Sequence, residues 1–312
     1  MHLEIEQGKT KGGLMMKALN FLVTLFLIGF LIIILGGNQS VQASIKSIQV
    51  VASISPLADL VTQVGGERVN VHLLVPNGVS PHTFDPKPSD IKKLEQADLF
   101  FIVGLGLEMF AYDMAQVVGN SLELIEVGKV VETIDDHEEN DHEHQFGNPH
   151  VWLSLQNLSF LAESVAEALI KIDPDNKEIY LKNAQSYIEQ CQQLDRWFSE
   201  KIKNSKTRHF IAAHSAWNYL ARDYNLVQIG VIEEKPGEEP SPKKIKTLID
   251  DLKSSESPVI FAEPQLSQKA AQILAQETGV KVIILDPLGL YPDVPFLQTM
   301  KDNLEKIAEA MQ

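Results

Sequence analysis

Four side chains of the sequence form a candidate ligand set for a divalent metal ion, and each lies where a predicted strand gives way to a loop. They are His82, His150, His214 and Asp286. Three imidazoles and one carboxylate make an N3O set, which suits the tetrahedral coordination of zinc. The carboxyl ends of the strands are also where open α/β sheets place their binding sites. The four positions therefore indicate a metal site.

Each of these positions also has a purely structural interpretation. His82 lies in a proline-rich turn, where a histidine often bonds only to backbone, and Asp286 precedes a proline, as many turn and cap residues do. The sequence contains no short metal motif such as His-Glu-x-x-His. The residue types and spacing alone thus predict candidate ligands within an α/β protein.

The elements that would position these residues are βα units. Short β-rich runs alternate with helical patterns, which predicts an α/β fold with mostly parallel sheets in two lobes that face each other across a cleft. Strands are expected at 48–53, 69–75, 99–103, 122–127, 209–213, 226–231, 259–262 and 280–285. Helices are expected near 89–96, 108–117, 154–172, 174–204 and 294–311, with further helices opening at Ser55-Pro56, Ser241-Pro242 and Leu266-Ser267.

One predicted helix is long enough to join the two lobes. It runs from Pro174 to Asn204, capped by Asp173, and its apolar residues recur at spacings of three and four. Cys191 lies on this stripe, so we interpret it as a packing residue. The expected organisation is an N-terminal lobe over 44–172, a linking helix over 173–204 and a C-terminal lobe over 205–312.

The N-terminus carries the features of an export signal. Basic residues precede a long apolar run over 19–35, and Val41-Gln42-Ala43 fits signal peptidase, so we expect residues 1–43 to be a signal peptide. The alternative is an uncleaved membrane anchor, because the run is long enough to span a bilayer. No cysteine follows it, so the sequence predicts a protein that is not a lipoprotein.

The charge balance excludes one class of partner. The chain has 27 basic and 42 acidic residues, a net charge of −15, which would repel a phosphate backbone. We therefore expect no nucleic-acid partner. The acidic segment 132–147 has almost no apolar content and is interpreted as a loop of the N-terminal lobe.

Five longer motifs resemble those of a known family. They are Pro81-His82-Thr83-Phe84-Asp85-Pro86-Lys87-Pro88-Ser89-Asp90, Asn148-Pro149-His150-Val151-Trp152-Leu153-Ser154, Ala213-His214-Ser215-Ala216-Trp217-Asn218-Tyr219-Leu220, Phe261-Ala262-Glu263-Pro264-Gln265 and Leu285-Asp286-Pro287-Leu288-Gly289. Together they resemble the metal-specific solute-binding proteins of ABC importers, the cluster A-I family. The resemblance implies two α/β lobes bridged by a long helix and one buried metal held by His82, His150, His214 and Asp286. In some zinc-type members the fourth place is filled by water or another oxygen donor, so this alternative to Asp286 stays open.

The third ligand position separates the branches of that family. Manganese-type members carry Glu where this chain has His214, so the resemblance favours the zinc-type branch. The segment with His137, His142 and His144 resembles a shortened His-rich loop that would bind metal weakly; its alternative is a solvated acidic linker. Glu263 is expected to orient a ligand histidine, or else to be structural.

The resemblance implies a function. We expect a monomeric periplasmic receptor that binds Zn(II) with high affinity and delivers it to the membrane permease of an ABC importer. The alternatives are a manganese- or iron-binding receptor of the same family, or, from another class, a zinc hydrolase with Glu263 as general base. We expect the receptor and no enzymatic activity.

Overall fold

The computed structural model describes residues 16–17, 21–22, 47–134 and 147–312. The chain divides into two units, Met1–Lys46 and Ser47–Gln312, and the few described residues of the first are helical. None of the helices within these ranges combines the length and apolar character needed to cross a bilayer. Almost all of the predicted signal peptide, and the three histidines at 137, 142 and 144, lie outside the described residues.

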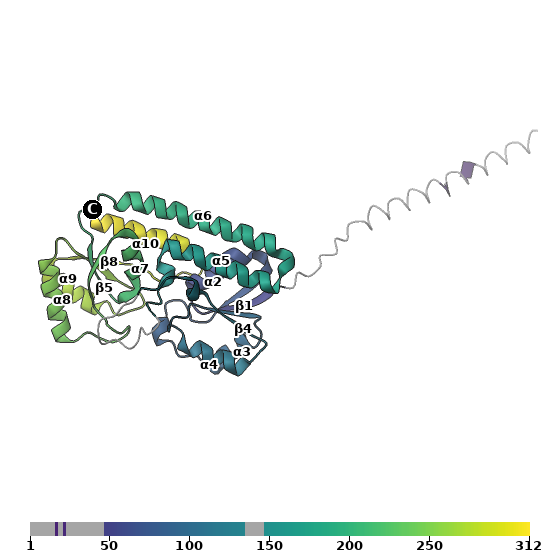
Figure 1. Cartoon of the computed structure of the whole chain (residues 1–312), viewed down its shortest axis with the longest axis horizontal. Coiled ribbons are helices and arrows are strands. Elements are labelled where there is room, and N and C mark those ends of the chain that lie inside the picture. The colour runs from purple at the N-terminus through teal and green to yellow at the C-terminus, as the bar shows by residue number, and fades with distance from the viewer. Residues whose placement is uncertain (1–15, 18–20, 23–46, 135–146) are drawn as a thin grey trace, which may run out of the picture. The chain divides into compact units, whose positions relative to one another are not determined.

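The unit Ser47–Gln312 contains two four-stranded parallel sheets, one in each lobe (Figure 1). The N-terminal sheet has the order β2-β1-β3-β4, with strands β1 Ile48–Ala52, β2 Val69–Leu73, β3 Leu99–Ile102 and β4 Glu123–Glu126. The C-terminal sheet has the order β6-β5-β7-β8, with strands β5 His209–Ala212, β6 Val227–Val231, β7 Val259–Ala262 and β8 Lys281–Ile284. The two sheets share one topology, and the predicted α/β fold with two lobes is confirmed.

Helices connect and cover these strands. The N-terminal lobe contains α2 Ser55–Gly65, α3 Pro88–Leu94, α4 Met109–Val118 and α5 Leu155–Ile172. The long helix α6 is Lys177–Ile202, and the C-terminal lobe contains α7 Asn218–Tyr224, α8 Pro242–Ser254, α9 Lys269–Thr278 and α10 Phe296–Met311. Every predicted strand has its counterpart within one or two residues of its expected ends, because short apolar runs between turn residues mark buried parallel strands well.

Several helix starts differ from the predictions. The long helix opens with a 3₁₀ turn, Pro174–Asn176, and Asp173 does not cap it, since its carboxylate accepts bonds from side chains. Helix α2 has Ile54 at its N-cap, so Ser55 does not cap it. Helix α9 begins at Lys269, two residues after the expected Ser267. By contrast, α8 opens at Ser241-Pro242 as predicted, and Ser241 caps it by accepting a bond from the backbone N–H of Lys244.

Helix α6 connects the lobes through a shared core. It is 26 residues long, roughly 39 Å at 1.5 Å per residue, and Figure 1 shows it running beside α5 and α10 and along both lobes. Its predicted apolar stripe is buried, including Cys191 at 0% exposure. One hydrophobic cluster contains residues of α6 together with residues of both sheets. Because α6 packs against both lobes along its length, it holds them as a stiff connection.

Candidate metal centre

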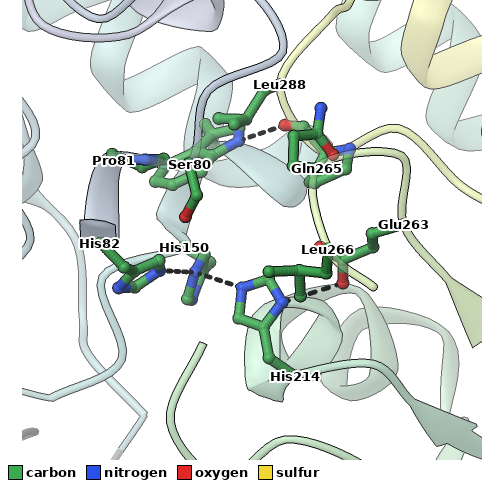
Figure 2. Close-up of a pocket in the computed structure, with 11 residues that line it drawn as sticks. Ser80, Pro81, His82, His150, His214, Glu263, Gln265, Leu266 and Leu288 are labelled. Carbon is green, nitrogen blue, oxygen red and sulfur yellow. Dashed lines mark hydrogen bonds and ion pairs between the residues drawn. The ribbon is translucent and has the colours of Figure 1, made fainter. Parts of the chain in front are cut away.

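Three histidine side chains converge between the lobes. Nε2 of His150 lies 3.0 Å from Nε2 of His82 and 3.0 Å from Nε2 of His214. Figure 2 shows the three rings turned toward one another, His82 and His150 from the N-terminal lobe and His214 from the C-terminal lobe. Two nitrogens bound to a tetrahedral zinc ion at about 2.0–2.1 Å are roughly 3.3 Å apart. The cluster therefore has nearly the spacing that ligands around one ion require.

Rigid local structure positions the two N-terminal histidines. His82 is the middle residue of a 3₁₀ turn, Pro81–Thr83, that follows β2. Pro81 fixes the backbone angle φ at the start of this turn. His150 immediately precedes the 3₁₀ turn Val151–Leu153, which leads into α5. His150 is 3% exposed, so its ring is withdrawn from solvent.

The ring of His150 is oriented by its neighbour Asn148. The Oδ1 atom of Asn148 lies 2.9 Å from Nδ1 of His150 and also accepts the backbone N–H of His150 at 2.9 Å. An amide oxygen only accepts, so the proton of a neutral His150 ring is on Nδ1. Its Nε2 lone pair consequently points at the other two histidines, which is the tautomer a metal ligand needs.

His214 lies at the end of β5 and faces a buried carboxylate. Oε1 of Glu263, which follows β7, is 3.0 Å from Nδ1 of His214, within ion-pair distance although not aligned as a hydrogen bond. β5 and β7 are neighbours at the point where the strand order of the sheet reverses, the usual site position in such folds. Burial raises the pKa of nearby Glu233, an effect that His214 opposes.

A close approach of the two lobes flanks His82. Gly237, in the turn after β6, has a φ of 90°, and a Cβ atom added there would lie 3.1 Å from Cγ2 of Thr83. Its backbone N–H donates to Oε2 of Glu233 at 2.8 Å. Glycine is required here both for its backbone conformation and for this contact.

The three histidines line a small cavity. Its volume is about 10 Å³, close to what one water molecule or small ion needs. The other lining residues are Ser80, Pro81, Trp152, Glu263, Gln265, Leu266, Pro287 and Leu288. Imidazole nitrogens in a small, mostly apolar cavity form a donor set that fits a single transition-metal ion.

Asp286 lies outside this cluster. In the part of the chain that the structure describes, the group of side chains able to share one ion contains the three histidines and no carboxylate. Oδ1 of Asp286 accepts the N–H groups of Leu288 and Gly289 and the amide of Gln265, and Oδ2 accepts the N–H of Leu290 at 2.6 Å. The carboxylate thus anchors the loop that follows β8.

Sequence reasoning overlooked two residues that shape the cavity. Trp152 packs its ring 5.3 Å from that of His150 and donates a hydrogen bond to the carbonyl oxygen of Pro287 in the other lobe. Gln265 lines the cavity and binds Asp286. Both lie within quoted motifs, but neither is an ordinary metal ligand, so residue type alone gave no signal.

Comparison with known proteins identifies the family. The model of the ZnuA family, described as zinc-uptake complex component A periplasmic, matches residues 50–310. The chain is 30% identical over 316 residues to the manganese ABC transporter substrate-binding lipoprotein PsaA of Streptococcus anginosus, covering 95% of this chain and 99% of PsaA. It is 32% identical to the zinc-binding lipoprotein AdcA of Streptococcus pneumoniae R6, covering 84% of this chain but only 55% of AdcA.

Solved structures agree with this result. A crystal structure of ZnuA has a TM-score of 0.77 and 31% identity, covering 85% of this chain and all of that one. The crystal structure of Zn(II)-bound AdcA from Streptococcus pneumoniae has a TM-score of 0.73 and 29% identity, covering 85% of this chain and 58% of that one. The common fold therefore extends over both lobes.

These relatives correct the location expected from the sequence. A periplasmic protein that is not a lipoprotein was expected because no cysteine follows the apolar run 19–35, but PsaA and AdcA are both named lipoproteins. That expectation is wrong. It rested on one residue type, the absence of a cysteine after the run 19–35.

The family match covers most of the chain, the fold agrees over both lobes, and three imidazoles meet between those lobes. The chain therefore belongs to the ZnuA family, the metal-binding, substrate-binding proteins of ABC transporters.

Proposed function

We propose that this protein is a zinc receptor that binds one Zn(II) ion between its lobes and delivers it to the permease of an ABC importer. The convergence of three Nε2 atoms within a buried cavity is the observation that carries this proposal. The ion is the cargo, with His82, His150 and His214 as its protein ligands.

The choice of zinc over manganese depends on His214. All three protein donors in the cluster are imidazole nitrogens, which suit zinc, whereas Mn²⁺ prefers carboxylate and other oxygen ligands. Relatives of both kinds are found, since PsaA is named for manganese and AdcA for zinc. The nitrogen-rich donor set supports zinc as the cargo of this chain.

Transfer requires the ligand shell to be distorted, because an ion held by three imidazole ligands leaves slowly. His82 lines both the small cavity and a larger hollow of about 410 Å³, which is lined by residues of both lobes including Phe110 and Lys235. We propose that the ion enters and leaves past His82 and that the permease docks on this side. Since α6 holds the lobes stiffly, release is expected to move local turns rather than open a wide hinge.

Metal titration tests the proposal. A monomeric chain stripped of metal should bind one Zn(II) in competition with a chelator, and His214→Ala should weaken that binding by at least about a hundredfold through loss of one ligand. His72→Ala is the control, since His72 is exposed on β2. Retained affinity in His214→Ala contradicts the site. Turnover of ester or peptide probes by the zinc-loaded protein would favour the hydrolase alternative instead.

A further inference from the structure

Gln265 lies between Asp286 and the histidine cavity. It follows β7, lines the cavity with the three histidines, and donates from Nε2 to Oδ1 of Asp286 at 2.9 Å. Figure 2 shows it on the same side of the cavity as Glu263 and Leu266, across from Ser80 and His82. Asp286 itself is not a lining residue. Gln265 therefore lies between the carboxylate of Asp286 and the cluster.

The orientation of the Gln265 amide follows from chemistry. An ionised carboxylate only accepts hydrogen bonds, so the NH2 group must face Asp286 and the carbonyl oxygen must face away from it. That oxygen, Oε1, is buried and has no hydrogen-bond partner among the residues the structure describes. A buried acceptor left unpaired costs free energy, which indicates that its partner is a group that enters the cavity.

The carboxylate of Asp286 is held too firmly in its loop to take the place of the group that enters the cavity. Three backbone N–H groups and Gln265 donate to its carboxylate, and its backbone is fixed by Asn303, which bonds to both its N–H and its carbonyl oxygen. To reach the ion, Asp286 would have to give up several charge-assisted bonds that shape the loop. An ion on the three histidines would then have a fourth position that a water molecule could occupy.

We propose that Gln265 is the positioning residue for the fourth coordination place of the metal: its NH2 group retains Asp286 in the loop, and its Oε1 accepts a hydrogen bond from a water molecule on the ion. A water on a divalent cation is a polarised donor, so an amide oxygen facing the cavity is a suitable partner. The inference rests on the proposed function, since it presupposes an ion on the three histidines.

Cobalt(II) is the probe for the test, because its visible absorption reports the number and type of its ligands. In the full chain, Gln265→Leu should bind Co(II) about tenfold more weakly than the wild type, the effect of one hydrogen bond to a charged group. Its visible band should also shift, because the water loses its partner. Added azide should shift the wild-type band by displacing that water.

Two further variants keep the result interpretable. Gln265→Met keeps the length of the side chain but removes its hydrogen bonds, and unlike Leu it is unbranched. It should show the same loss of Co(II) affinity and the same band shift as Gln265→Leu, even if the branched Leu side chain disturbs the fold. Gln228→Leu is the matched control. Gln228 also has a buried Oε1 without a hydrogen-bond partner in the described part of the chain, but it lies on β6 and does not line the cavity. Its Co(II) affinity and band should equal those of the wild type.

The outcomes separate the two proposals. If the wild type fails to bind Co(II) or Zn(II) at one ion per chain, the receptor function fails. If it binds but both Gln265 variants keep its affinity, band and azide response, the role of Gln265 is overturned. It is equally overturned if azide leaves the wild-type band unchanged while Asp286→Asn shifts it, because Asp286 would then be the fourth ligand.

Discussion

Nε1 of Trp152 donates a 2.7 Å hydrogen bond to the carbonyl oxygen of Pro287, and this bond joins the two lobes beside the histidine cluster. Trp152 follows His150 by two residues, and Pro287 follows Asp286 directly. The bond therefore links the backbone that carries His150 to the loop that borders the cavity from the C-terminal lobe.

Trp152 is expected to report metal binding by its fluorescence. Its ring lies 5.3 Å from that of His150, so placing a divalent charge on His150 changes the field at the indole. Zinc should change the emission of the wild type, and Trp152→Phe should lose most of that change. Trp197→Phe is the control, because Trp197 lies on α6. A full zinc response in Trp152→Phe would disprove the assignment.

Glu263 is expected to strengthen zinc binding by holding the ring of His214. The carboxylate lies 3.0 Å from Nδ1, so it stabilises the ring with Nε2 facing the ion. Glu263→Gln should lower zinc affinity by about tenfold in a chelator competition assay. Glu200→Gln, at an exposed position of α6, should leave affinity unchanged. Equal affinity for both variants would leave Glu263 with a structural role only.

The buried carboxyl of Glu108 should make the stability of the metal-free protein depend on pH. Burial raises its pKa from 4.5 to about 7, although Ser53 and the N–H groups of Val103 and Gly104 donate to it. The folded state then binds more protons than the unfolded state between those values. The contribution of Glu108 to the free energy of unfolding is therefore complete below pH 4.5, declines as the pH rises toward 7, and is constant above pH 7.

Glu108→Gln should remove this slope. The free energy of unfolding of the variant minus that of the wild type should increase by about 3 kcal/mol between pH 4.5 and pH 8. This increase does not depend on how the two proteins differ in stability at low pH. Urea unfolding in the presence of a chelator measures it at several pH values. Glu167→Gln, exposed on α5, should keep the wild-type slope. Parallel curves for Glu108→Gln and the wild type would show that Glu108 does not titrate in this range.

Asp173 should stabilise the start of the linking helix. It accepts from Arg68 at 2.9 Å, from Tyr180 at 2.7 Å and from Asn176. Burial opposes its ionisation, but these bonds outweigh burial and hold its pKa below the usual value. Its stabilisation is thus present at neutral pH and is lost as pH falls through the folded pKa.

Asp173→Asn is expected to lower the free energy of unfolding by about 1–2 kcal/mol at pH 7, a modest loss because the pair with Arg68 is partly exposed. Urea unfolding at pH 7 and pH 3 measures the difference, which should shrink at pH 3. Asp175→Asn, two residues away and exposed, should have no effect. An equal loss at both pH values would mean that the charge of Asp173 contributes nothing.

Local patterns were enough to predict the strands and three of the site residues. Short apolar runs and turn residues marked the strands, and a histidine at a strand end carries its chemistry in its residue type. His82, His150 and His214 could therefore be identified as candidates, and the structure brings them together. Their convergence depends on two lobes packing through α6, which no local pattern encodes.

The roles of Asp286, Asp173 and Gln265 depended on tertiary contacts. Asp286 reads as a ligand from its residue type, but the donors that occupy its carboxylate come from the loop beyond it and from Gln265. Asp173 is typical of a helix cap by residue type, yet its carboxylate accepts from Arg68, 105 positions away. Such partners are set by packing, so spacing along the chain could not reveal them.

Changing His214 to Glu should shift metal preference from zinc toward manganese. The substitution replaces an imidazole nitrogen by a carboxylate oxygen, and oxygen ligands suit the harder Mn²⁺ ion. The ratio of zinc to manganese bound, measured by equilibrium dialysis and elemental analysis, should fall by about a hundredfold or more. His72→Glu, the same change on the exposed face of β2, should leave the ratio unaltered.

The new carboxylate would lie beside Glu263, and this adjacency sharpens the test. Two buried carboxylates in contact repel each other. The single variant His214→Glu should therefore bind every metal ion more weakly than the same ligands would without the neighbouring charge of Glu263. The double variant His214→Glu, Glu263→Gln removes that repulsion and should recover manganese binding while zinc stays weak. If both variants keep the wild-type ratio of zinc to manganese, the residue at position 214 does not set the metal preference, and the argument for zinc from the donor set is wrong.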